Sequence, residues 1–84
     1  MRPVLCITKA RVVGDFRLRL SFSDGVSKEV FAGNILDGPI FEPLNDPDYF
    51  RLMRLDTRCG TVVWPNGADF APEALWELED LAAG

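Results

Sequence analysis

Apolar and polar residues alternate most regularly over residues 16–22, and this stretch anchors the predicted fold. The apolar positions are Phe16, Leu18, Leu20 and Phe22, and the polar ones between them are Arg17, Arg19 and Ser21. Because successive side chains of a β-strand point to opposite faces, the apolar set is expected to face a core and the polar set solvent. The stretch is therefore predicted to be a half-buried strand of an antiparallel sheet.

The stretches on either side of this strand are predicted to pair with it. Val4 to Val13 is rich in β-branched residues, and its length predicts a bend or bulge. After the Ser23-Asp24-Gly25 turn, Val26 to Phe31 forms the third strand. A three-residue loop with Gly25 left-handed keeps one face apolar, because it places Phe22 opposite Val26, whereas a two-residue loop does not. Lys28 is the one misfit on that face.

The middle of the chain has no sustained period. Ala32 to Asn45 contains prolines and glycines among apolar anchors, so it is expected to cross the sheet edge, with a helical turn near Asn34. Asp46 precedes Pro47 and is predicted to cap a short helix. Two further strands are predicted at residues 52–56 and 61–64.

A tight turn and a helix complete the predicted fold. Trp64, Pro65, Asn66 and Gly67 are expected to form a type I turn, after which the Asp69 carboxylate accepts from nearby backbone amides. Pro72 to Ala82 carries an apolar stripe at helical spacing. The prediction is one α+β domain over residues 1–84: an antiparallel sheet of about five strands, a short helix, and a C-terminal amphipathic helix packed on one face.

Composition and charge narrow the possible roles. The chain has 84 residues, 48% hydrophobic and 26% charged, with no apolar run long enough to span a membrane and no secretion signal, so a cytoplasmic protein is expected. The net charge is −4, and residues 59–84 contain five acidic residues and no basic one, whereas basic residues predominate before residue 32. Such asymmetry suggests internal complementarity or a partner with a charged face.

The residues that usually carry catalysis are scarce. The chain has no histidine, and no base accompanies the serines at positions 21, 23 and 27. Cys6 and Cys59 lack metal spacing and are expected to be reduced, mostly buried thiols. The acids at positions 37, 42, 46 and 48 lack the spacing of a calcium loop. No catalytic residue, metal or cofactor is predicted, and a small ligand-binding or enzymatic domain using Asp69 is the least favoured alternative.

An acidic ridge on the predicted C-terminal helix is the candidate contact surface. Glu73, Glu77 and Asp80 repel one another along a helix, and Trp76 flanks them. Because aromatic residues are enriched at interfaces, this ridge is predicted to be exposed and to bind another protein or form a homodimer. Trp76 folded over the margin of the core is an equal alternative. A second interpretation is an accessory domain of a transcriptional regulator that binds nucleic acid through the outward residues Lys9, Arg11, Arg17 and Arg19. The negative net charge of the chain disfavours such binding.

Several blocks of sequence resemble a known bacterial family. They are Phe22-Ser23-Asp24-Gly25, the run Gly38 to Leu44 with Asp46 and Phe50, and the run Gly60 to Leu75 containing Trp-Pro-Asn-Gly-x-Asp. In order and spacing they are similar to the domain of unknown function family 2442. The resemblance implies a small α+β fold without an established activity. Some relatives continue into a helix-turn-helix, whereas short ones are associated with a second small protein in toxin–antitoxin fashion. This chain resembles the short form.

Overall fold

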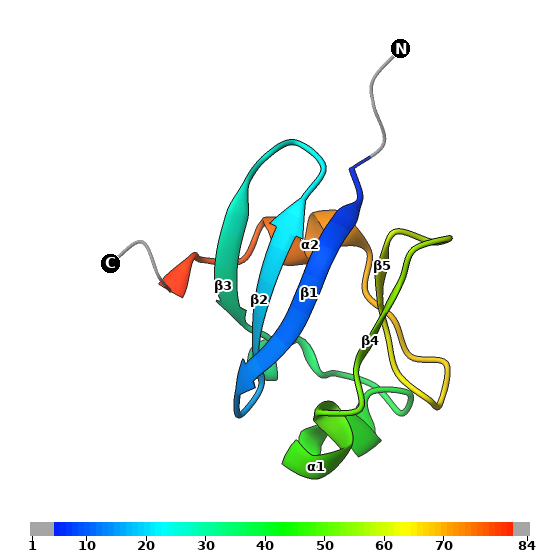
Figure 1. Cartoon of the computed structure of the whole chain (residues 1–84). Helices are drawn as coiled ribbons and strands as arrows, with labels where there is room; N and C mark the ends of the chain where they lie inside the picture. Colours follow the sequence, from blue (N-terminus) through cyan, green and yellow to red (C-terminus); the bar gives the residue numbers. More distant parts are fainter. Residues whose placement is uncertain (1–4, 82–84) are drawn as a thin grey trace.

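The alternating stretch forms the middle strand of a three-stranded antiparallel sheet in a computed structural model that describes residues 5–81 (Figure 1). The strands are β1 (Ile7–Gly14), β2 (Arg17–Phe22) and β3 (Ser27–Phe31), in that spatial order. Leu18 and Leu20 are fully buried, and Phe22 is 3% exposed. The predicted alternation is confirmed, and β2 supplies the centre of the core.

The hairpin between β2 and β3 has the predicted three-residue loop. Leu18 lies opposite Val30, and the Phe22 amide donates to the Val26 carbonyl at 2.8 Å. Gly25 has a φ of 90°, a backbone conformation that residues with a Cβ atom rarely adopt. This register keeps one face of the hairpin apolar except at Lys28, which pairs with Leu20.

The first strand is bulged, as its length predicts. Its pairing with β2 shifts between Ile7 and Lys9 and again between Val12 and Gly14. Phe16, predicted to begin the strand, instead lies in the turn before β2 with a φ of 61°. Its ring makes edge contacts with the rings of Phe31 and Phe50, and this packing offsets the cost of the left-handed conformation.

The prediction of one sheet of about five strands is wrong. β4 (Arg54–Asp56) and β5 (Thr61–Val63) pair with each other and form a separate two-stranded sheet beside β1 (Figure 1). The turn between them ends at Gly60, whose φ is 70° and whose carbonyl accepts from the Ile7 amide at 2.7 Å. This hydrogen bond links the two sheets, and Figure 1 shows β1 and β4 running apart beyond it.

The crossing segment is pinned by apolar side chains, as expected. It contains 3₁₀ turns at Gly33–Ile35 and Glu42–Asn45, and the short helix α1 (Pro47–Phe50) follows it. Leu36 and Leu44 are buried along it, and Phe50 is fully buried. Asp46 caps α1, because its carboxylate accepts from the Asp48 amide at 3.0 Å.

The predicted long C-terminal helix is also wrong. α2 spans only Pro72–Trp76, and its single fully buried residue is Leu75. At its C-terminal end the Lys28 ammonium donates to the Trp76 carbonyl at 2.5 Å, so that oxygen is already engaged where a longer helix would use it. The acids that follow, Glu77 and Asp80 among them, also oppose the negative end of the helix dipole. Ala82, the predicted end, lies outside the described residues.

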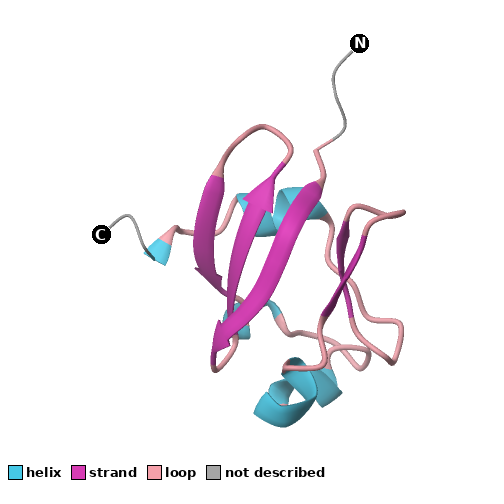
Figure 2. Cartoon of the chain, in the orientation of Figure 1, coloured by secondary structure: helices cyan, strands magenta, loops and turns pink. Residues whose placement is uncertain are grey.

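One core lies between the three-stranded sheet and the elements behind it. Figure 2 shows α2 behind the three strands, with the two-stranded sheet and α1 at one side. The Trp64 indole N–H donates to the Phe50 carbonyl at 2.9 Å, which satisfies the only polar atom of that buried side chain. The buried apolar residues are Ile7, Leu18, Leu20, Phe22, Val30, Ala32, Leu36, Leu44, Phe50, Val62, Trp64, Ala68, Phe70 and Leu75.

Candidate protein-interaction surface

Trp76, at the end of α2, is both anchored and exposed. Its indole N–H donates to the Asp24 carboxylate at 3.0 Å, and the Lys28 nitrogen lies 5.5 Å from its ring centroid. Both partners belong to the β2–β3 hairpin, yet 40% of Trp76 remains exposed. One side of Trp76 therefore lies against the hairpin, and the rest of the residue faces solvent. Lys28 contributes here, so its place among apolar neighbours has a structural reason.

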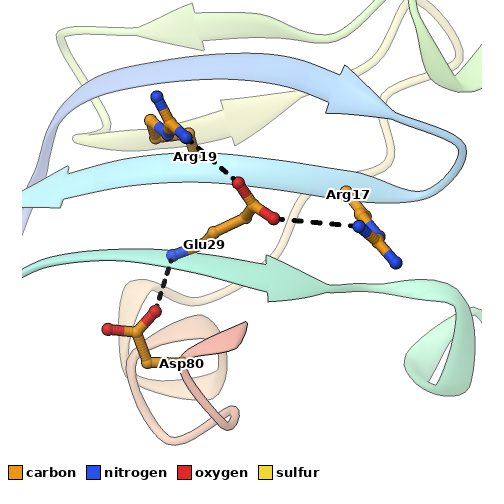
Figure 3. Close-up of polar contacts among 4 residues, drawn as sticks. All are labelled: Arg17, Arg19, Glu29 and Asp80. Atoms are coloured by element: carbon orange, nitrogen blue, oxygen red, sulfur yellow. Dashed lines mark hydrogen bonds and ion pairs between the residues drawn. The ribbon is translucent and has the colours of Figure 1, made fainter. Parts of the chain in front are cut away.

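The acidic residues around Trp76 divide into two sets. Glu73 and Glu77 are exposed on either side of it in sequence. Asp80 is half-buried, and its carboxylate accepts from the Glu29 amide of β3 at 3.2 Å (Figure 3). The expectation that Asp80 lies exposed on the same ridge is wrong, because α2 ends before Asp80 and the chain turns onto the edge of β3.

Glu29 joins this C-terminal segment to the outer face of the sheet. Its carboxylate lies 3.2 Å from the Arg19 guanidinium and 4.0 Å from that of Arg17. Figure 3 shows Glu29 between the two arginines, with Asp80 on its backbone amide. The Glu29 side chain is 17% exposed, against 55% and 59% for the two arginines. Part of the basic face predicted from the sequence is therefore neutralised by an acid on the neighbouring strand.

A small groove lies where β3 meets the C-terminal segment. Its volume is about 320 Å³. Phe31, Leu78 and Leu81 are its apolar lining residues, and Arg17, Asn34 and Glu79 are the polar ones. Phe31 pairs with Arg17 in register and is 37% exposed. Phe31 is an aromatic residue on the outer face that the sequence-based candidate surfaces do not include, although its place one residue after the buried Val30 indicates an outward side chain.

The Trp-Pro-Asn-Gly turn supports the fold through a different residue from the one expected. The Gly67 amide donates to the Trp64 carbonyl at 2.9 Å, and the Asn66 side chain accepts from the Ala68 amide at 3.1 Å and donates to the Ile40 carbonyl at 2.8 Å. Asp69 is exposed and pairs with Val63 through its backbone. The expected buried hydrogen bond of Asp69 is wrong, because strand geometry at this position turns its side chain outward.

The remaining candidate groups are dispersed. Cys6 is half-buried and Cys59 is exposed, so the prediction of buried thiols is wrong for Cys59; both are free. Asp56 accepts from the backbone amides of Cys59 at 3.2 Å and Arg58 at 2.9 Å, and these hydrogen bonds lower the pKa of its carboxyl group. Across residues 5–81, no three acidic or cysteine side chains gather closely enough to hold a metal ion. Within the same range, the helices are too short to cross a membrane.

Comparison with known proteins gives a family and a fold. Residues 7–80 match the family described as "Protein of unknown function (DUF2442)". The structure resembles the crystal structure of "Putative DNA Binding Protein NE0471" from Nitrosomonas europaea ATCC 19718, with a TM-score of 0.77 and 26% sequence identity. The match covers 100% of this chain but 56% of that one, so this chain spans just over half of its length. The curated proteins include no match.

Proposed function

The chain belongs to the DUF2442 family, and we propose that it is a non-enzymatic module that binds a second protein through Glu73, Trp76 and Glu77. The observation that supports this proposal is the state of Trp76, which is 40% exposed although two side chains of the β2–β3 hairpin hold it. Fixing a large aromatic side chain before binding reduces the conformational entropy lost on association. Tryptophan is also among the residues that most often dominate binding energy at interfaces.

The charge around Trp76 defines the kind of partner. Glu73 and Glu77 are exposed beside it, whereas Asp80 already accepts from β3 and is left out of the contact. A basic protein surface complements this arrangement, and charge attraction speeds association at low ionic strength. We therefore propose a small basic protein as the partner, in the manner of a toxin–antitoxin pair, with a homodimer as the competing arrangement.

Affinity capture from the native lysate, followed by purification of the captured protein, tests this proposal. Wild-type chain is expected to bind one basic protein stoichiometrically, with an affinity that falls as salt is added. The variant Glu73→Lys/Trp76→Ala/Glu77→Lys should lose that protein. The matched control is Glu42→Lys/Leu52→Ala, which alters an exposed acid and an exposed apolar residue outside this surface.

Two results would overturn the proposal. One is equal binding of the purified partner by wild type and by the triple variant at low salt. The other is a wild-type dimer, detected by sedimentation equilibrium, that the triple variant dissociates, because the surface would then serve self-association.

A second candidate function is nucleic-acid binding through the outer face of the sheet. It is supported by the name of the Nitrosomonas europaea protein and by the outward positions of Lys9, Arg11, Arg17 and Arg19. Glu29 pairs with two of these residues and the chain carries a net charge of −4, so we expect binding to duplex DNA weaker than about 10⁻⁴ M at physiological salt. Fluorescence anisotropy with a labelled duplex measures this. Tighter, salt-dependent binding that Arg11→Glu abolishes would favour this function instead.

A further inference from the structure

The outer edge of β1 has backbone groups that no neighbouring strand uses. Phe22 bonds to β3 through Val26, so by alternation the even residues of β2 bond to β3 and its odd residues bond to β1. Arg11, the partner of Arg19, therefore points its backbone N–H and C=O toward β2, and Ala10 and Val12 point theirs away. The backbone N–H of Ile7 also points away from β2, and it donates to the Gly60 carbonyl. Among residues 5–81, no such backbone bond reaches Ala10 or Val12.

A groove opens at this part of the edge. Beyond the contact between Ile7 and Gly60, β1 and β4 run apart, and Figure 1 shows the widening gap between the two ribbons. The space has a volume of about 610 Å³. Its lining consists of the β1 edge on one side and the chain around β4 on the other: Ala10, Arg11, Val12, Val13, Gly14, Arg51, Met53 and Leu55.

The charge of the groove has one sign. Within residues 5–81, the charged residues of its lining are Arg11 and Arg51, and Met53 and Leu55 give it an apolar wall. Arg51 pairs with Asp15 at 3.4 Å and with Asp48 at 3.7 Å, but those carboxylates are 68% and 90% exposed. Pairs so exposed to water are weak, so an incoming carboxylate can replace them.

We propose that this groove binds an extended segment of a partner protein, which adds to the edge of β1 as a further strand and places a carboxylate between Arg11 and Arg51. Main-chain hydrogen bonds to Ala10 and Val12 would provide affinity, and Met53 and Leu55 would receive an apolar side chain. A second copy of this chain fits the edge poorly, because pairing β1 with β1 brings Lys9 and Arg11 against their own counterparts. The proposal does not depend on the surface around Trp76.

Selection of random peptides displayed on phage against the immobilised chain provides the probe. Enriched peptides are expected to combine an acidic residue with β-branched or aromatic neighbours. When one of them is synthesised and bound, hydrogen exchange should slow at the amides of Ala10 and Val12. The Arg11 amide is the internal control, because its bond to β2 already protects it. Methylating alternate backbone nitrogens of the peptide should abolish binding, since those groups would form the new ladder.

Charge variants test the proposed contact of a partner carboxylate with Arg11 and Arg51. Arg11→Glu/Arg51→Glu should weaken the selected peptide by about tenfold, because two exposed attractions become repulsions. Arg58→Glu, at an exposed arginine outside the groove, is the matched control and should bind as wild type does. The proposal is overturned if no peptide is enriched, if the slowed amides lie on β3 or around Trp76, or if the N-methylated peptide binds equally well.

Discussion

The two edge strands of the three-stranded sheet, β1 and β3, differ in how far other parts of the chain cover them. At β3 the C-terminal segment crosses the edge, and Asp80 accepts from the outward amide of Glu29. At β1 the first outward amide, that of Ile7, donates to the Gly60 carbonyl, and no other outward amide of β1 has a backbone partner among residues 5–81. The rest of the β1 edge opens into the groove. One edge is covered by a segment distant in sequence, whereas the other is closed at one end only.

This difference shows how a small domain can limit strand addition and still retain one place for it. An exposed edge is a template for pairing with other chains, so folded proteins cover it, charge it or keep it short. Here Asp80 accepts from the β3 edge, and β1 carries Lys9 and Arg11. Basic side chains on β1 disfavour self-pairing but leave it able to accept an acidic strand.

The largest expected effect on stability comes from β2, the strand that lies between the two edge strands. Leu20 is fully buried in the middle of β2, and Leu20→Ala should lower the free energy of unfolding by about 2–5 kcal/mol through lost burial and a residual cavity. Urea denaturation measures this loss, and amides on both edges should lose protection together. The control Arg11→Ala, on the exposed side of the sheet, should change stability by no more than about 0.5 kcal/mol. Loss of protection at one edge alone would mean that the edges unfold independently.

The closed end of the β1 edge is tested by comparing two glycines of similar conformation. Gly60 and Gly67 have φ values of 70° and 88°, so each should suffer about 1–2 kcal/mol of backbone strain when changed to alanine. A Cβ at Gly60 would also lie 2.9 Å from the Cys6 sulfur, whereas one at Gly67 meets nothing within 4 Å. Gly60→Ala should therefore cost about 2–4 kcal/mol in all, more than Gly67→Ala.

Thermal and urea melts of both glycine variants provide the measurement. Adding Cys6→Ala should partly rescue Gly60→Ala, because it removes the sulfur that the new methyl group meets, and should leave Gly67→Ala unrescued. Equal losses for the two glycine variants would show that the close approach of Cys6 contributes nothing at this junction.

The sequence predicts the local parts of both edges well. Alternation alone identifies β2 and its buried face, and the glycine-containing turn fixes the pairing of Phe22 with Val26. The cap at Asp46 and the bulges of β1 also follow from nearby residues. In each case the deciding interaction lies within a few residues or across one hairpin, where residue type restricts the geometry strongly.

The parts that the sequence does not predict depend on contacts between distant residues. At the end of α2 the Trp76 carbonyl accepts from Lys28, which lies 48 positions earlier in the chain. β4 lies in a separate sheet, and the hydrogen bond that links that sheet to β1 joins Ile7 to Gly60, which is 53 positions later in the chain. The candidate surface shows the same limit: its exposed members follow from helical periodicity, whereas the contact of Asp80 with Glu29 needs the three-dimensional fold.

The covered edge is tested by removing its acceptor. Asp80→Ala should destabilise the fold by about 1 kcal/mol, because the part-buried Glu29 amide loses a hydrogen-bond partner. Hydrogen exchange at Glu29 should speed up, while the Lys28 amide, which faces β2, stays protected. Asp80→Asn, which keeps an oxygen acceptor, should lie between wild type and alanine. Unchanged exchange at Glu29 in Asp80→Ala would show that the C-terminal segment does not cover this edge in solution.

The smallest expected effect concerns pH and the turn that places Gly60 against β1. Two backbone amides, those of Cys59 and Arg58, lower the pKa of Asp56 in the folded state. Ionised Asp56 therefore stabilises the fold at pH values above the unfolded pKa of about 3.9, and this contribution is lost as the pH falls through the lowered folded-state pKa. Thermal melts of wild type and Asp56→Asn should differ at neutral pH, with the variant melting lower, and should converge in acid. Thr57→Ala, in the same turn, should keep the wild-type pH profile. A gap between wild type and Asp56→Asn that persists in acid would assign the effect to turn geometry instead of charge.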